Sequence, residues 1–192
     1  MATIQELVRK NRSYRRFDQT HLIDTATLHA LVDAGRLSPN GANLQTLRYA
    51  VSNGATNNLV FPTLGWAGYL KDWDGPAEGE RPTGYIIMLC DSASAKNPLE
   101  DAGIAAQSIM LGAVEQGLGG CIFKNINRKQ LKENLRLPEN LDILMVLALG
   151  KPVETVVIDP VGADGDIKYW RDEANVHHVP KRALADVLID IQ

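Results

Sequence analysis

Three arginines and a serine stand close together near the start of the chain. The segment reads Arg12-Ser13-Tyr14-Arg15-Arg16. A guanidinium group presents a rigid fork of donors that suits a phosphate or an anionic ring edge, and a serine hydroxyl adds one more hydrogen bond. Charged side chains in short runs are usually solvated. Composition alone therefore favours an exposed basic turn over an anion site.

A second polar segment, 38–45, carries two carboxamides after a turn. Its sequence is Ser-Pro-Asn-Gly-Ala-Asn-Leu-Gln. Proline, asparagine and glycine in close succession predict a loop. The amides of Asn43 and Gln45 can donate and accept hydrogen bonds together, which suits the polar edge of a heterocyclic ring such as a flavin. An ordinary connection between a helix and a strand has the same composition.

A glycine-rich turn at 117–120 and a basic pair near the C-terminus are two further candidates. The turn follows a predicted helix and precedes a predicted strand, the reverse of the Rossmann order, and Ile122 stands where that motif needs a glycine. We reject the Rossmann interpretation, although glycines without a Cβ could still admit a planar cofactor. Lys181 and Arg182 could close on a phosphate or begin a charged surface helix.

Other common kinds of site have little support. His177 and His178 are adjacent, so in a strand they point to opposite faces, and no acidic ligand motif accompanies them. The GxSxG and GxxxxGK motifs with Ser or Thr are absent from the sequence, which removes the serine-hydrolase and P-loop interpretations. Cys90 and Cys121 lack the CxxC spacing and are predicted to be buried and reduced. We predict no metal ligands.

Periodicity and capping residues predict the elements that position these segments. Helices are expected at 4–8, from Asp24 or Thr25 through the thirties, from Pro98 to Gln116, and from a cap at Asn127 through 135. Strands are expected at 49–52, 83–90, 120–123 and 141–149, with a partly helical stretch at 58–70 and an amphipathic segment at 182–191. The helix from Pro98 carries an Asn97 cap and many small residues, and is predicted to be buried nearly all round.

Length and composition predict one globular α+β domain over residues 1–192, with a sheet flanked by helices. Apolar residues make up 45% and charged residues 22% of the chain, which is typical of globular proteins. A net charge of -3 gives no broad positive field, so we expect neither nucleic acid nor membrane as a partner. The first residues lack a signal-peptide core, and we expect a cytoplasmic protein.

Taken in order, these segments resemble the nitroreductase family of FMN-dependent oxidoreductases. Residues 11–17 resemble the family's RRSxRxF opening, and 38–45 its SPSxxNxQPW loop. The glycine turn, the strand ending in Gly150-Lys-Pro and the segment from Pro180 to Leu184 are similar to its later motifs. The resemblance runs from about residue 5 to about residue 187. Two departures are Asn11 in place of the first arginine and Thr46-Leu47 in place of Pro-Trp.

The resemblance implies a set of cofactor-binding residues. Arg12, Ser13 and Arg15 would contact the phosphate, ribityl chain and pyrimidine edge of FMN, and Lys181 and Arg182 would close on the phosphate. In the family's motif the position of Arg16 is variable, so Arg16 is expected to be solvated.

Further contacts are implied from the loop and from the strand after the glycine turn. Asn43 and Gln45, from the partner subunit, would reach the ring and the ribityl chain. Backbone groups between residues 122 and 125 would face flavin N5 and O4; these residues are Ile122, Phe123, Lys124 and Asn125.

The resemblance also implies an α+β fold with a central antiparallel or mixed sheet, an interlocked homodimer and FMN in the groove between subunits. NAD(P)H would be the co-substrate in ping-pong hydride transfer to a nitroaromatic, quinone or similar acceptor, with no catalytic side chain needed. Trp66, Tyr69 and Trp73 could form an aromatic lid, with core packing expected for at least one of them. Two alternatives stay open: a flavin-binding sensor or sequestration protein with incidental reductase activity, and flavin fragmentation or reductive dehalogenation.

Overall fold

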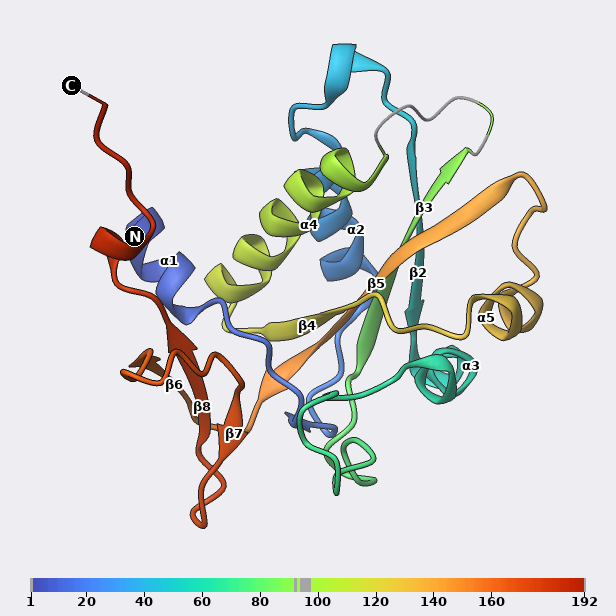
Figure 1. Cartoon of the computed structure of the whole chain (residues 1–192). Coiled ribbons are helices and arrows are strands. Elements are labelled where there is room, and N and C mark those ends of the chain that lie inside the picture. The colour runs from blue at the N-terminus through green and yellow to red at the C-terminus, as the bar shows by residue number, and fades with distance from the viewer. Residues whose placement is uncertain (1, 92, 94–97, 192) are drawn as a thin grey trace. The chain divides into compact units, whose positions relative to one another are not determined.

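The computed structural model describes residues 2–91, 93 and 98–191 (Figure 1). The chain divides into two compact units. The first comprises residues 1–66 and 75–153, and the second comprises residues 67–74 and 154–192. The interpretation of 1–192 as a single domain stays a prediction.

The first unit is built on a five-stranded antiparallel sheet. The strands follow the order β1-β5-β3-β2, and β4 pairs with β5 as well. Their bounds are β1 (Phe17–Asp18), β2 (Leu47–Asn53), β3 (Gly84–Asp91), β4 (Gly119–Phe123) and β5 (Leu141–Pro152). The four strands predicted from the sequence are confirmed, and β2 and β5 extend beyond their predicted ends.

The described residues of the same unit form five α-helices: α1 (Ile4–Lys10), α2 (Thr25–Arg36), α3 (Asn57–Val60), α4 (Pro98–Glu115) and α5 (Arg128–Leu135). The cap predicted at Asn127 is confirmed, and of the two predicted starts Asp24 or Thr25, Asp24 is the cap. The Asp24 carboxylate accepts from the Thr27 N–H at 2.7 Å, and the Asn127 side chain accepts from the Gln130 N–H at 3.2 Å. Such bonds satisfy donors that the first turn leaves free. The predicted cap at Asn97 lies outside the described residues.

The two faces of β3 are buried against different helices because side chains alternate along a strand. Ile86, Met88 and Cys90 belong to a core cluster with residues of α2 and α4, which lie side by side in Figure 1. Tyr85 and Ile87 belong to the other cluster, with residues of α3 and α5. Burial on both faces explains why this strand is an unbroken apolar run.

Helix α4 is covered on only part of its surface. Leu99 and Ile104 are each 46% exposed, and Gly103 and Gln107 are exposed as well. The prediction that this helix is buried nearly all round is therefore wrong for the single chain. Its small residues allow close packing against α2 on one side, and its other side remains an exposed apolar surface.

The second unit is a three-stranded sheet in the order β6-β8-β7. The strands are β6 (Val156–Pro160), β7 (Trp170–Arg171) and β8 (His177–Lys181), with β6 parallel and β7 antiparallel to β8. Of the expected amphipathic segment at 182–191, the structure forms only a 3-10 turn, Leu184–Asp186.

Both cysteines are buried and neither forms a disulfide, as predicted for Cys90 and Cys121. Burial raises the pKa of the Cys90 thiol. None of the helices that the structure describes is long and apolar enough to cross a membrane.

Candidate functional site

Arg12, Ser13 and Arg15 lie on the segment between α1 and β1, beside the edge of β4. The Tyr14 N–H donates to the Gly120 carbonyl at 2.9 Å, and Ser13 forms a parallel β-bridge with Gly120. The structure thus brings together two segments that are about a hundred residues apart in the sequence. The basic cluster is positioned by a strand and does not belong to an isolated turn.

The backbone of Ile122 faces the same edge of β4. In an antiparallel pair, successive residues direct their N–H and C=O groups alternately toward the partner strand and away from it. Gly120 gives its carbonyl to Tyr14, so Ile122, two residues later, presents its own backbone groups on that side. The Ile122 side chain is 42% exposed. This edge can therefore receive a ligand.

Residues that follow Ile122 are fixed against the segment around Gly65. The Asn125 carbonyl accepts from the Gly65 N–H at 2.9 Å, and a Cβ on Gly65 would lie 2.0 Å from Asn125 Nδ2. Phe123 is 4% exposed and packs edge-on against Trp66, with ring centroids 4.6 Å apart. Lys124 is exposed. Trp66 therefore packs in the first unit, as expected for at least one of the three aromatic residues.

The glycines at the start of β4 allow neighbouring residues of the protein to pack closely against this strand. A Cβ on Gly119 would lie 2.6 Å from the Tyr14 ring, and a Cβ on Gly120 would lie 2.3 Å from the Ala148 carbonyl oxygen. Both contacts are too close for any larger residue. These two glycines allow β4 to pack against its neighbours, so the interpretation that they admit a planar cofactor is not needed.

Arg12 and Ser13 keep donors that the described residues do not use. Arg12 Nη2 donates to the Val8 carbonyl at 2.7 Å, which anchors the guanidinium. Arg12 Nε is buried and has no hydrogen-bond partner among the residues that the structure describes. Ser13 is exposed, and its hydroxyl bonds to no residue within the described part of the chain.

Arg15 and Arg16 have different surroundings. Arg15 is only 7% exposed, and its Nη1 donates to the Ser13 carbonyl at 3.1 Å. Arg16 forms a two-bond ion pair with Glu80, with Nε 2.7 Å from Oε2. The side chains of this pair are 26% and 32% exposed. The expectation that Arg16 is a solvated arginine is therefore wrong, because Glu80 holds it.

The 38–45 loop adopts a backbone conformation that ordinary residues rarely take. Ala42, Asn43 and Gln45 have φ values of 48°, 54° and 51°, in the left-handed region. Each such residue costs on the order of 1 to 3 kcal/mol and persists only where its surroundings enforce it. The Asn40 side chain accepts from the Gln45 N–H at 3.0 Å, and Asp101 accepts from the Gly41 N–H at 2.8 Å.

Asp101 is a positioning residue that the sequence did not reveal. It is 7% exposed and lies in the first turn of α4. Acidic residues are favoured in any first helical turn because of the helix dipole. The sequence therefore contains no sign that this carboxylate binds the loop.

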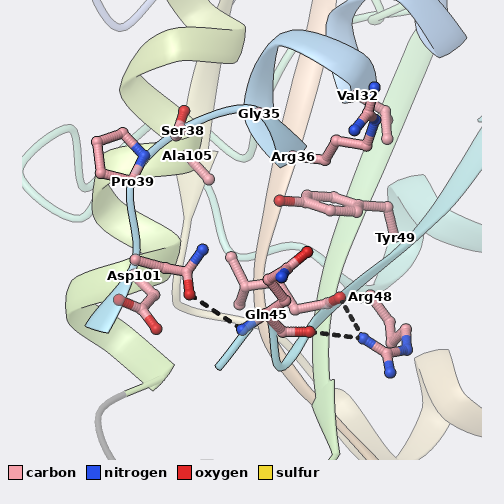
Figure 2. Close-up of a pocket in the computed structure, with 12 residues that line it drawn as sticks. Val32, Gly35, Arg36, Ser38, Pro39, Gln45, Arg48, Tyr49, Asp101 and Ala105 are labelled. Atoms are coloured by element: carbon pink, nitrogen blue, oxygen red, sulfur yellow. Dashed lines mark hydrogen bonds between the residues drawn. The ribbon is translucent and has the colours of Figure 1, made fainter. Parts of the chain in front are cut away.

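The loop borders a cavity of about 320 Å³ (Figure 2). Gln45 and Asp101 line it together with Arg36 of α2 and Tyr49 of β2. Figure 2 shows the Tyr49 ring between Arg36 and Gln45, while the Arg48 guanidinium turns aside to bond backbone carbonyls. Burial raises the pKa of the Tyr49 hydroxyl, which has no hydrogen-bond partner among the described residues.

Within one chain, the end of the loop that carries Asn43 and the arginine segment lie at different places along α4. The first residue of the loop, Ser38, donates to Ser108 at 2.7 Å, but Gly41, two residues before Asn43, bonds Asp101. The Asn11 side chain donates to Gln107 at 3.3 Å, six residues further along α4 than Asp101. Six residues of α-helix span about 9 Å. Figure 1 shows the Gly41–Asn43 turn beyond one end of α4 and the start of β4 at the other end. Asn43 and Gln45 therefore do not join Arg15 within a single chain.

The remaining predicted residues belong to the second unit. Lys181 ends β8 and Arg182 follows it, and both are exposed. Tyr69 packs against Tyr169 with ring centroids 4.9 Å apart, and Trp73 lies under the Arg171 guanidinium at 4.3 Å. The roles of these two basic residues and of the lid stay predictions.

The fold is an antiparallel sheet between helices, with a basic segment along the edge of β4, and it belongs to the α+β class that the sequence predicted. The model of the nitroreductase family matches residues 8–64 and 81–151, more than half of the chain. The chain therefore belongs to the nitroreductase family, and the resemblance stated from the motifs is confirmed.

Solved structures share the fold at low sequence identity. A nitroreductase from Desulfovibrio desulfuricans in complex with FMN has a TM-score of 0.71 and 20% identity, covering 100% of this chain and 98% of that chain. A mutant of the FMN- and NADPH-dependent nitroreductase NfnB from Sphigopyxis sp. strain HMH has a TM-score of 0.69 and 19% identity, covering 100% and 99%. A nitroreductase family protein from Clostridium difficile 630 has a TM-score of 0.63 and 21% identity, covering 80% and 86%. A comparison with curated proteins finds no match.

Proposed function

We propose that this chain is a cytoplasmic FMN-dependent oxidoreductase. It passes hydride from NAD(P)H to a nitroaromatic, quinone or similar small acceptor in ping-pong order. The observation that carries the proposal is the attachment of the Arg12-to-Arg15 segment to the edge of β4. Membership of the nitroreductase family and structural neighbours named for FMN and NADPH support it. Two cysteines without a disulfide agree with a reducing compartment.

The donors at this edge fit the chemistry of FMN. The cofactor carries a phosphate, a chain of hydroxyls and a ring with a polar edge, and all three accept hydrogen bonds. A buried donor without a partner costs about 1 to 3 kcal/mol, so a ligand acceptor at Arg12 Nε would remove this cost. Arg12, Ser13 and Arg15 would hold the cofactor, with Lys181 and Arg182 on the phosphate.

Bound FMN supplies the redox chemistry, and the protein holds and tunes it. Arg15 is buried, so its charge acts in a medium of lower dielectric than water and would stabilise negative charge on the ring edge. The backbone of Ile122 would hydrogen-bond the ring from the β4 edge. Trp66 and Phe123 give this part of the protein a rigid apolar support. This arrangement requires no side chain as nucleophile or general acid.

A second copy of the chain would complete the site. Asn43 and Gln45 sit on a strained loop that lies apart from the arginine segment of the same chain. The exposed apolar face of α4, with Leu99 and Ile104, offers a surface for a twofold contact. Light scattering of FMN-loaded protein is expected to give twice the chain mass. A stable FMN-loaded monomer would contradict the shared site.

Steady-state kinetics test the activity. Protein reconstituted with FMN is expected to oxidise NADH or NADPH when a nitroaromatic or quinone acceptor is present, with parallel double-reciprocal lines as the two substrates are varied. Protein without FMN and reactions without acceptor are the controls. Tight FMN binding without turnover would overturn the reductase proposal and favour a sensor or sequestration protein.

A further inference from the structure

A second cavity in the first unit holds a positive charge without an acidic partner. It has a volume of about 230 Å³ and lies between the end of β2 and the start of β3. Arg81 and Tyr85 line it, and none of the described residues around it is acidic. It shares no lining residue with the segments proposed to bind FMN.

Arg81 is a half-buried guanidinium that the fold holds in place but leaves unpaired. Its side chain forms no hydrogen bond and no ion pair with any residue that the structure describes, and its Nε is buried. Its Cζ lies 4.5 Å from the centre of the Phe61 ring, which orients the plane of the guanidinium. The adjacent Glu80 is already bound to Arg16. A partly buried cation without a counter-ion favours an anion beside it.

Tyr85 lines the same cavity and carries an unused donor. Its side chain is fully buried, and its hydroxyl has no hydrogen-bond partner in the described part of the chain. Burial raises the pKa of the Tyr85 hydroxyl, while the charge of Arg81 lowers it by a smaller amount. The hydroxyl therefore stays protonated and able to donate, and Arg81 lies near enough to act on the same ligand.

We propose that this cavity binds a small organic carboxylate. One carboxylate oxygen accepts from the Arg81 guanidinium, and the other accepts from the Tyr85 hydroxyl. Leu22, Phe61 and Pro82 give the cavity apolar lining that suits a compact apolar body, and Gln19, Asn57, Asn58 and Thr83 line it as well. Inorganic phosphate fits less well, because it has no apolar part to cover Leu22, Phe61 and Pro82. The volume is below the roughly 300 Å³ at which pockets for drug-sized ligands begin, so the ligand is small.

Titration calorimetry of the FMN-loaded protein with benzoate tests the proposal, with neutral benzamide as the matched ligand. Benzoate is expected to bind saturably and benzamide at least about tenfold more weakly, because only benzoate carries the charge. Arg81→Gln and Tyr85→Phe are each expected to weaken benzoate by about tenfold or more. Arg9→Gln removes an exposed arginine elsewhere and is expected to leave the affinity within about twofold.

Tyr85→Phe keeps the test decisive if Arg81→Gln fails to fold. It removes only a hydroxyl without a partner, so the ligand-free protein is expected to remain at least as stable. Absence of saturable benzoate binding would overturn the proposal. So would benzoate binding that both substitutions leave unchanged, which would place the ligand elsewhere, for example over the flavin. Phosphate binding as tightly as benzoate would overturn the carboxylate class.

Discussion

Replacing Arg15 by alanine is expected to release FMN, whereas replacing Arg16 by alanine is expected to destabilise the fold. The two side chains are chemically identical neighbours with different partners. Arg15 is buried beside Ser13 at the edge of β4, and Arg16 is held by Glu80. Each variant therefore serves as the control for the other.

The expected sizes follow from these surroundings. Loss of a charge-assisted hydrogen bond costs about 1.5 to 3 kcal/mol, which raises the Kd of FMN about 10- to 150-fold in Arg15→Ala. The Arg16–Glu80 ion pair is half-buried. Its energy is expected to lie between that of exposed pairs, which contribute up to about 1 kcal/mol, and that of buried pairs, whose rupture costs about 3 to 5 kcal/mol. We expect a loss of about 1 to 2 kcal/mol and a fall in Tm of about 2 to 8 °C for Arg16→Ala.

Fluorescence titration of each apoprotein with FMN measures the affinities, and thermal unfolding of the same samples measures the stabilities. Arg15→Ala also removes packing around a buried stem, so affinities are compared at a temperature where both variants are folded. Equal FMN affinity in the two variants, or a larger loss of affinity in Arg16→Ala, would refute the assignment of Arg15 to the cofactor.

Three further predictions concern other parts of the chain. Replacing Lys181 and Arg182 together by alanine should weaken FMN binding strongly and riboflavin binding hardly at all, because riboflavin lacks the phosphate. An unchanged ratio of the FMN and riboflavin affinities would show that this pair does not bind the phosphate. Asp101→Ala should leave the Gly41 N–H without its acceptor, lower stability by about 1 to 2 kcal/mol and speed amide exchange in the loop, and unaltered exchange would contradict this role. Hydrogen bonds to Asp159 and Asp172 raise the pKa of His178, so its stabilising effect is complete below about pH 6.5 and is lost as the pH rises through the raised value. The Tm should therefore fall more steeply as the pH rises above about 6.5 in the wild type than in His178→Gln, and parallel curves of Tm against pH would exclude the effect.

Elements with strong local signals were predictable from the sequence. Asp24 and Asn127 cap helices with side-chain oxygens, and an unbroken apolar run marks β3. The motifs also identified the family. These features depend on residues a few positions apart, so their physical causes are visible in a linear sequence.

Features set by tertiary contacts were not predictable. The pairing of Arg16 with Glu80 joins residues 64 positions apart. The family's motif, in which this position is variable, therefore suggested a solvated arginine. The left-handed backbone at Gln45 depends on Asn40 and on the buried Asp101, and these residue types are common in any loop or helix start. Which face of α4 is covered depends on the other elements that pack against it, and the spacing of its apolar residues does not reveal these elements.

The visible spectrum of the purified protein, followed through one reductive and one oxidative step, tests the central proposal most directly. We predict an absorption band near ~450 nm from bound oxidised flavin. Addition of NADH or NADPH without oxygen should bleach this band, and a nitroaromatic or quinone acceptor should restore it. A protein that takes up no FMN, or a flavin band that neither nicotinamide changes, would contradict the proposed function.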